Sequence, residues 1–228
     1  MGKLQRYLHW LHLQWPAGKV EKLPVVNEDG TTAVSGVRVV GDLTGVPLLK
    51  FAADTGAKAV AAVAAELGTD IGGESGPADL AIVGGGVAGL SAALEAQKLG
   101  LRFVVFEASK PMSTLVNFPK GKPIFTYPTD LDPAGDLKLT ATVKEDLVEE
   151  LETQRIAAGI EPKQARIEKL VRKGDFVELH HPDGAPFKAR RVIVAIGRSG
   201  NHRKLGVPGE DLDKVSNRLH DPAEFADR

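Results

Sequence analysis

A glycine-rich motif directly after a buried strand constrains the fold of this chain more than any other feature. Residues 79–83 are interpreted as an apolar strand of the kind buried on both faces of a parallel sheet. The strand leads into GGGVAG at residues 84–89, which opens a helix expected over 90–99, and a second apolar strand over 102–106 ends at Glu107. This order of strand, turn, helix and strand predicts a βαβ unit and an α/β fold with a central parallel sheet.

The residue types of this motif suit a dinucleotide. Gly84 permits the tight turn, Gly86 has no Cβ and lets a pyrophosphate approach the backbone, and Gly89 allows the helix to pack close to the strand. The N–H groups of the helix start, which includes Val87 and Ala88, offer a partial positive charge to the phosphates. The alternative is a glycine-rich turn that binds no ligand.

An acidic residue stands where the ribose of a nucleotide would lie. Glu107 follows Gly84 by 23 residues, close to the spacing of about 20 in dinucleotide-binding folds. Its carboxylate can accept two hydrogen bonds from an adenosine ribose, and its charge disfavours a 2′-phosphate. The next residue, Ala108, is counted with the same site. The alternative is that Glu107 is an ordinary surface acid.

Further segments extend the expected sheet. Residues 36–42 form a short β-branched strand ending in Gly41 and Asp42, and an alanine-rich helix follows over 48–67. Residues 191–197 form another buried strand that ends in Ala195, Ile196 and Gly197. We also expect a flexible glycine-rich connection over 68–77, an irregular stretch over 109–135, a helix over 138–158, and alternating strands over 167–171 and 176–180. These last two strands predict a small antiparallel β-meander.

Three of these motifs together resemble the FAD-binding part of the pyridine nucleotide-disulfide oxidoreductase superfamily, in its thioredoxin reductase-like form. They are AIVGGGVAGLSAAL at 81–94, VIVAIG at 192–197, with Ile196 where threonine is usual, and GVRVVGD at 36–42. The segment KLGVPGE at 204–210 is similar to the loop that precedes the NAD(P)H domain of that family. The NFP segment at 117–119 is loosely similar to the bacillithiol-disulfide reductase branch.

The resemblance implies FAD as the cofactor and assigns parts of its site. Gly41 and Asp42 would approach the ribityl or pyrophosphate region. The helix start near Lys50 and Phe51 would face the flavin pyrimidine ring, where its dipole, helped by Lys50, would stabilise the anionic reduced flavin. The other positions implied to approach the cofactor are Ala195 and Gly197. The alternatives are a helix cap at Asp42, a solvated Lys50 and ordinary packing at the strand end.

The order of the motifs departs from the family. There the Gly-Asp motif lies near the C-terminus, whereas here it precedes the glycine-rich motif. The Gly-Asp strand should end at the ligand edge of the sheet, and its helix should return to the edge where the strand over 79–83 begins. The connection over 68–77 would then join neighbouring ends. We therefore expect a circularly permuted, Rossmann-like FAD-binding domain. The alternative is domain swapping, in which the first 70 residues complete the site of another chain.

These expectations divide the chain into five parts. They are an N-terminal aromatic segment and lead-in (1–35), the Gly-Asp flavin motif and helix (36–67), a linker (68–77), the FAD-binding core (78–212) and a polar tail (213–228). The family's NAD(P)H domain would normally begin at that tail. Only one glycine-rich motif of this kind is present, so no NAD(P)H domain is visible in the sequence.

Composition narrows the function further. The chain has no cysteine, which excludes a disulfide, a thiolate metal site and a redox-active CxxC within it. Its formal net charge of -1 provides no basic field for nucleic acid. No catalytic residue and no metal site is evident from the sequence, and we expect a cytoplasmic protein.

The expected function is that of an FAD-binding flavoprotein oxidoreductase module. Electrons would come from NAD(P)H through a domain or a redox partner protein that is not in this chain. The alternative is a non-catalytic nucleotide-binding or electron-relay subunit that docks through its N-terminus. A homodimer also stays open.

One N-terminal motif has no place in this scheme. Residues 7–15, YLHWLHLQW, are apolar and aromatic but too short to span a bilayer. They also lack the apolar core and cleavage site of a secretory signal. Packing on the protein or on a partner is favoured, and contact with a membrane surface is the less favoured alternative.

Overall fold

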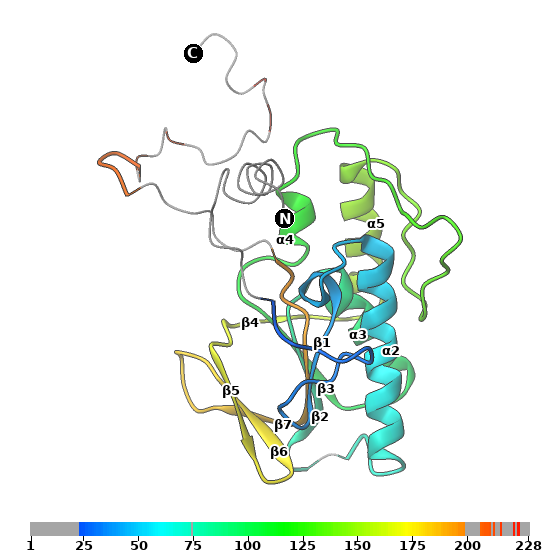
Figure 1. Cartoon of the computed structure of the whole chain (residues 1–228), viewed down its shortest axis with the longest axis vertical. Helices are drawn as coiled ribbons and strands as arrows, with labels where there is room; N and C mark the ends of the chain where they lie inside the picture. Colours follow the sequence, from blue (N-terminus) through cyan, green and yellow to red (C-terminus); the bar gives the residue numbers. More distant parts are fainter. Residues whose placement is uncertain are drawn as a thin grey trace, which may run out of the picture.

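The protein folds around one mixed sheet that has helices on one side (Figure 1). The computed structural model describes residues 23–73, 75–198 and 206–210 together with Leu212, Val215, Asp221 and Ala223. The strands are β1 (Val37–Val39), β2 (Ala78–Val83), β3 (Phe103–Glu107), β4 (Lys163–Gln164), β5 (Lys169–Lys173), β6 (Phe176–His180) and β7 (Phe187–Val194). The helices are the 3-10 helix η1 (Gly41–Thr44), α2 (Leu49–Leu67), α3 (Val87–Lys98), α4 (Ser113–Val116) and α5 (Lys144–Ala157).

The sheet combines a parallel part with an antiparallel part, and β7 belongs to both. The strand order is β4-β3-β2-β7-β6-β5, and β1 lies beside β7. Residues 187–189 of β7 pair antiparallel with β6, and residues 192–194 pair parallel with β1. On its other edge β7 is parallel to β2, which is parallel to β3. The expected α/β fold class, with a central parallel sheet and a small antiparallel meander, is confirmed.

The alternation of side chains along β2 separates two apolar layers. Leu80 and Ile82 face the helices and pack in the larger core with Val60 of α2. Ala81 and Val83 face the opposite side, where the β5–β6 hairpin closes over the sheet (Figure 1). Because both faces of β2 are buried, the strand has no polar face, and this explains its nearly continuous apolar sequence.

The alanine-rich composition of α2 follows from its close packing on α3. A Cβ added to Gly56 would lie far inside van der Waals contact with the carbonyl oxygen of Ala88. The Ser91 hydroxyl donates a 2.6 Å hydrogen bond to the carbonyl of Ala53 across the same contact. Small residues let the two helix backbones approach, so α2 is an integral part of the domain.

The connection over 68–77, which the sequence predicts to be flexible, is held by hydrogen bonds and ion pairs among its described residues. The Asp79 carboxylate accepts from the backbone N–H of Gly72 at 2.7 Å. Arg190 of β7 forms ion pairs with Asp70 at 2.9 Å and with Asp79 at 3.3 Å. The connection is therefore tied to β2 and β7 at the edge where β2 begins.

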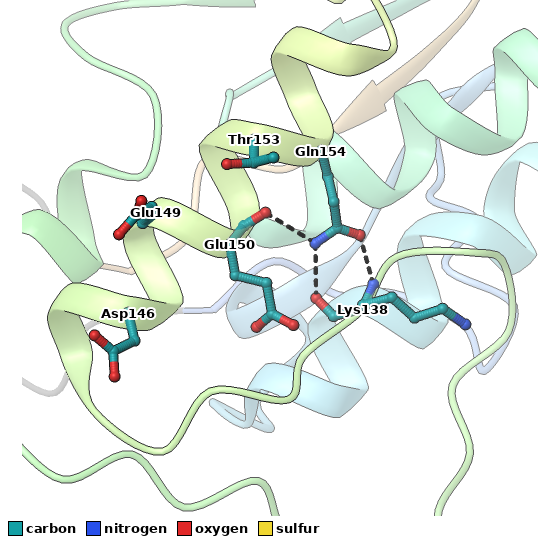
Figure 2. A pocket seen from close by; sticks show the side chains of 6 residues that line it. All are labelled: Lys138, Asp146, Glu149, Glu150, Thr153 and Gln154. Carbon is teal, nitrogen blue, oxygen red and sulfur yellow. Dashed lines mark hydrogen bonds between the residues drawn. The ribbon is translucent and has the colours of Figure 1, made fainter.

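The helix expected over 138–158 begins later than predicted, at Lys144. Residues 138–141 instead run along α5, where the Gln154 side chain bonds both the N–H and the carbonyl of Lys138. Figure 2 shows this arrangement in a shallow hollow on α5. The Glu150 carboxylate accepts from the backbone N–H groups of Thr140 and Ala141. The side chains of Glu150 and Gln154 thus bond backbone groups that would otherwise pair within a helix or with a strand. The sequence pattern does not reveal these long-range hydrogen bonds.

Candidate functional site

The carboxyl ends of the parallel strands meet at one edge of the sheet and bring the sequence motifs together. Backbone hydrogen bonds connect the strand ends, from Gly84 N–H to Phe106 O at 2.7 Å, from Ala195 N–H to Val83 O at 2.7 Å, and from Val40 N–H to Val194 O at 3.0 Å. In open α/β sheets, ligands bind in the crevice outside these ends. The predicted glycines, Glu107 and the Gly-Asp motif all lie at this edge.

Two of the predicted glycines are required by the packing of the protein itself. Gly84 has a φ of +115°, and a Cβ there would collide with the carbonyl oxygen of Ala195. A Cβ on Gly89 would collide with the carbonyl oxygen of Gly84. The first glycine therefore makes the turn, and the second lets α3 approach it.

Gly86 differs because nothing in the described structure requires it to be glycine. A Cβ at this position would meet no atom within 4 Å. Gly86 is also the N-cap of α3, and no side chain caps this helix start. Helix α3 begins at Val87, three residues earlier than expected, so the first N–H groups of the helix lie inside the motif. An anion could approach these groups without displacing a protein side chain.

Glu107 holds the glycine-rich loop in place, a role that the sequence does not reveal. Its Oε2 accepts a 2.7 Å hydrogen bond from the N–H of Gly85, and its Oε1 accepts one of 2.9 Å from the N–H of Ser109. A carboxylate offers about four lone-pair sites, so it retains capacity for the hydroxyls of a ligand. The neighbouring Ala108 is exposed.

The Gly-Asp motif lies directly beside the start of α3, although the two are far apart in sequence. A Cβ on Gly41 would lie 3.1 Å from the Cβ of Ala88. Gly41 has a φ of +71°, which favours glycine at this turn, and its N–H donates to the hydroxyl of Thr55 at 3.1 Å. Thr55, on α2, was not predicted from the sequence, and no motif marks it.

Asp42 presents a half-buried carboxylate to this edge. It receives no hydrogen bond from the described residues and does not cap α2, whose N-cap is Leu48 without a side-chain cap. Burial raises the pKa of Asp42, and the positive charge of Arg198 opposes this rise. A partly desolvated carboxylate with spare acceptors suits a ligand that carries hydroxyl groups.

Because the pKa of Asp42 is raised, we predict that replacing this residue by a neutral one increases thermal stability, and that the increase depends on pH. Between the ordinary and the raised value, the folded state binds more protons than the unfolded state, so ionised Asp42 lowers stability as pH rises through this window. We expect Asp42→Asn to raise the Tm by about 1–2 °C at pH 7 and by less at pH 4. The exposed Asp130→Asn should change neither value. A Tm lowered at pH 7 would contradict this prediction and reveal a partner of the carboxylate.

The N-terminus of α2 also has no side-chain cap. Lys50, in its first turn, binds the backbone of a loop. The Lys50 ammonium donates to the carbonyl oxygens of Pro128 at 2.9 Å and Leu131 at 2.7 Å, with Thr129 at 3.4 Å. Phe51 follows in the first turn of α2 and is partly buried. In this structure the charge of Lys50 positions the loop over 128–131 against the N-terminus of α2.

We expect Lys50→Met to destabilise the protein by about 1–2 kcal/mol, because charge-assisted hydrogen bonds to three carbonyls are lost at a partly buried site. Limited proteolysis should show faster cleavage near residues 128–131. The control is Lys58→Met on the same helix, where the lysine is exposed and pairs with Asp54. An unchanged proteolysis pattern together with a shifted flavin potential would assign Lys50 to the flavin instead.

The last predicted positions lie at the end of β7. Ala195 is buried, and its carbonyl oxygen is the atom that Gly84 approaches. Gly197 has a φ of +64°, and a Cβ there would meet no atom within 4 Å. Ile196, where the family motif usually has threonine, is 59% exposed. This strand end therefore leaves open space at Gly197, next to the glycine-rich turn.

Neither a metal site nor a membrane span emerges from the part of the chain that the structure describes. Within it, no three His, Cys, Asp or Glu side chains gather in a way that could hold a metal ion. No helix among these residues is both long and apolar enough to cross a membrane. The calls on residues 1–22 and on most of 213–228 lie outside the described residues.

Comparisons of the sequence with known proteins find one family model and two relatives. The family model described as pyridine nucleotide-disulphide oxidoreductase matches residues 81–228. A ferredoxin–NADP reductase of Ignicoccus hospitalis is 31% identical over 148 residues, 65% of this chain and 46% of the relative. A thioredoxin reductase of Helicobacter pylori is 30% identical over 133 residues, 58% of this chain and 39% of the relative.

Solved structures of related enzymes give partial superpositions. The bacillithiol disulfide reductase of Staphylococcus aureus aligns with a TM-score of 0.49 at 18% identity, over 61% of this chain and 44% of that one. The thioredoxin reductase of Lactococcus lactis aligns with a TM-score of 0.45 at 24% identity, over 58% and 39%.

These similarities cover only part of this chain and part of each relative. This chain spans less than half the length of the curated relatives that it matches. The matched range begins within β2, so the Gly-Asp motif and α2 lie outside it. The range nevertheless contains more than half of the residues, including the glycine-rich loop, Glu107 and the end of β7. The chain therefore belongs to the pyridine nucleotide-disulphide oxidoreductase family.

Proposed function

We propose that this chain binds FAD at the carboxyl edge of its parallel sheet and serves as a flavoprotein redox module. The observation that carries the proposal is the contact between Gly41 and Ala88, which sets the Gly-Asp motif beside the glycine-rich loop. A nucleotide site alone would need only the glycine-rich loop and Glu107. The Gly-Asp motif adds a carboxylate, and α2 adds a second uncapped helix N-terminus. Together they suit a ligand longer than a single nucleotide.

The residues at this edge fit the parts of FAD. The open position at Gly86 and the free N–H groups of α3 would hold the pyrophosphate. Glu107 would accept hydrogen bonds from the adenosine ribose while it keeps its bond to Gly85. Asp42 would accept hydroxyl groups of the ribityl or pyrophosphate region, which would favour its ionised form and offset its desolvation.

The redox chemistry would belong to the flavin, which accepts hydride and passes electrons on when it is bound. The N-terminus of α2 would place a partial positive charge near the flavin pyrimidine ring, because no side chain caps it. Lys50 would act by positioning the loop over 128–131 against this helix start. Ala195 and Gly197 would leave the backbone accessible to the cofactor.

We further propose that the domain is circularly permuted within one chain. The support is the parallel pairing of β1 with β7 and the short, bonded connection from α2 to β2. Electrons would come from NAD(P)H through a domain or partner protein that is not in this chain. The chain has no cysteine, so reduction of a disulfide substrate would need thiols from elsewhere.

An absorbance spectrum of the purified chain tests the proposal, before and after anaerobic addition of NADH or NADPH. Oxidised flavin bands, present as purified or after incubation with FAD, would support the cofactor assignment. Bleaching would add that a nicotinamide reaches the flavin without a dedicated domain. A colourless protein that fails to retain added FAD would overturn the proposal.

The second candidate function is a nucleotide-binding or electron-relay subunit without its own turnover. The lack of cysteine and the single glycine-rich motif of this kind favour it over a complete disulfide reductase. Flavin that stays oxidised with NAD(P)H, but is reduced once a partner reductase is added, would support this second function. Bleaching by NAD(P)H alone would exclude it.

A further inference from the structure

An exposed apolar patch surrounds the N-terminus of α2. We define this patch as Leu23, Val46, Leu48, Phe125 and Tyr127, whose side chains are between 36% and 69% exposed. The rings of Phe125 and Tyr127 stack on each other with centroids 6.1 Å apart. Large apolar side chains that are grouped on a surface mark a place where something else packs.

The two halves of the patch are held together by observed contacts. Leu23 packs toward Gly45, next to Val46, with a side-chain atom 3.8 Å from the position of a Gly45 Cβ. Tyr127 precedes Pro128, whose carbonyl binds the Lys50 ammonium at 2.9 Å. Since Lys50 lies two residues after Leu48, both halves border the first turn of α2.

The chain itself supplies an occupant. The described residues begin at Leu23, inside the patch, and 22 residues precede it in the sequence. Among these residues, the aromatic segment at 7–15 contains Tyr7, Trp10 and Trp15. Trp15 precedes Leu23 by eight positions, a reach of about 26 Å when extended, whereas a helix with its side chains is about 10–12 Å wide. The segment can therefore reach the patch around Leu23.

Charge favours the same occupant. Residues 1–22 contain four Lys or Arg residues and one Glu, all of them outside 7–15, so the flanks of the aromatic segment are basic. Asp130 and Asp132 flank Leu131, the residue whose carbonyl binds Lys50, and both are exposed. An aromatic segment with basic flanks would thus suit an apolar patch bordered by carboxylates.

We propose that the segment at 7–15 docks in cis on the patch. This inference goes beyond the proposed function and does not depend on bound FAD. Docking would give the N-terminal motif a role within its own chain.

Tryptophan fluorescence of the full chain tests the docking, because both tryptophans of the protein lie in this segment. We expect emission at shorter wavelength and a lower acrylamide quenching constant than in a free peptide of residues 1–22. Val46→Ser combined with Phe125→Ser should shift both values to those of the peptide. Ile156→Ser is the matched control, since Ile156 is 65% exposed on α5 and lies outside the patch.

A second pair of substitutions and three contrary results complete the test. If the patch variant fails to fold, as judged by circular dichroism, Asp130→Lys with Asp132→Lys should release the tryptophans through charge repulsion. Indoles in the unaltered chain that are as accessible as those in the peptide would overturn docking. A signal that depends on protein concentration would assign the patch to a second copy, and one that changes only with anionic lipid vesicles would assign the segment to a membrane. Both results would overturn docking in cis.

Discussion

Replacement of Gly86 by valine is expected to abolish FAD binding and to leave the fold intact. The position is extended, with φ −82° and ψ −167°, a conformation that valine adopts readily. A Cβ there meets no protein atom within 4 Å, so its only conflict would be with a ligand that approaches the N-terminus of α3. We expect FAD affinity to fall about 100-fold, which corresponds to about 2.8 kcal/mol. Titration followed by flavin fluorescence measures this loss.

The matched control is Gly89→Ala, three residues further along the same motif and in the first turn of α3. Its Cβ would collide with the carbonyl oxygen of Gly84, so this smaller change should destabilise the protein itself. Thermal unfolding separates the two variants, because the Gly86 variant should melt like the parent. Parental FAD affinity in Gly86→Val would show that no pyrophosphate lies at this loop.

Replacement of Gly56 by valine is expected to cause the largest loss of stability. Its Cβ would enter the carbonyl oxygen of Ala88 at the contact between α2 and α3, where backbone atoms cannot move aside cheaply. Overpacking of this kind costs about 3 kcal/mol, or roughly 6–12 °C in Tm for a domain of this size. Urea unfolding measures the loss. Ala61→Val, at an exposed position of the same helix, should cost a few tenths of a kcal/mol.

The concentration dependence of the parent's Tm tests whether α2 is packed on its own chain. In one chain, the Tm of the parent should not depend on protein concentration, whereas an exchanged α2 makes folding bimolecular. A Gly56→Val protein as stable as the parent would contradict the helix contact. A Tm that rises with concentration would favour domain swapping over permutation.

Local sequence patterns were sufficient for the βαβ unit that carries the glycine-rich motif. The βαβ unit was predicted because strand, turn and helix signals are short-range, and the structure places β2, α3 and β3 close to the expected bounds. The turn at Gly84 and the close approach at Gly89 follow from backbone geometry that glycine alone tolerates. Of the strand expected over 36–42, only Val37–Val39 form β1, and Gly41 and Asp42 begin the 3-10 helix η1.

Contacts between distant residues were beyond the reach of these patterns. The late start of α5 depends on Glu150 and Gln154, which bind the backbone of residues 138–141. From sequence alone, charged residues on one face of a helix are interpreted as exposed to solvent, because the pattern does not indicate which segment packs against that face. The supposedly flexible connection is likewise held by Asp79 and Arg190, which lie in separate strands.

The sequence by itself determined the fold class, the glycine-rich loop and the residue types at each strand end, because these depend on periodicity and backbone conformation. The tertiary structure alone decided how the motifs meet. Glu107 holds Gly85, Lys50 binds the carbonyls over 128–131, and Gly41 contacts Ala88 only once the sheet has formed. The physical reason is that β1 joins β7 through pairing across more than 150 residues, and this pairing is selected by burial of both strands, which no local pattern records.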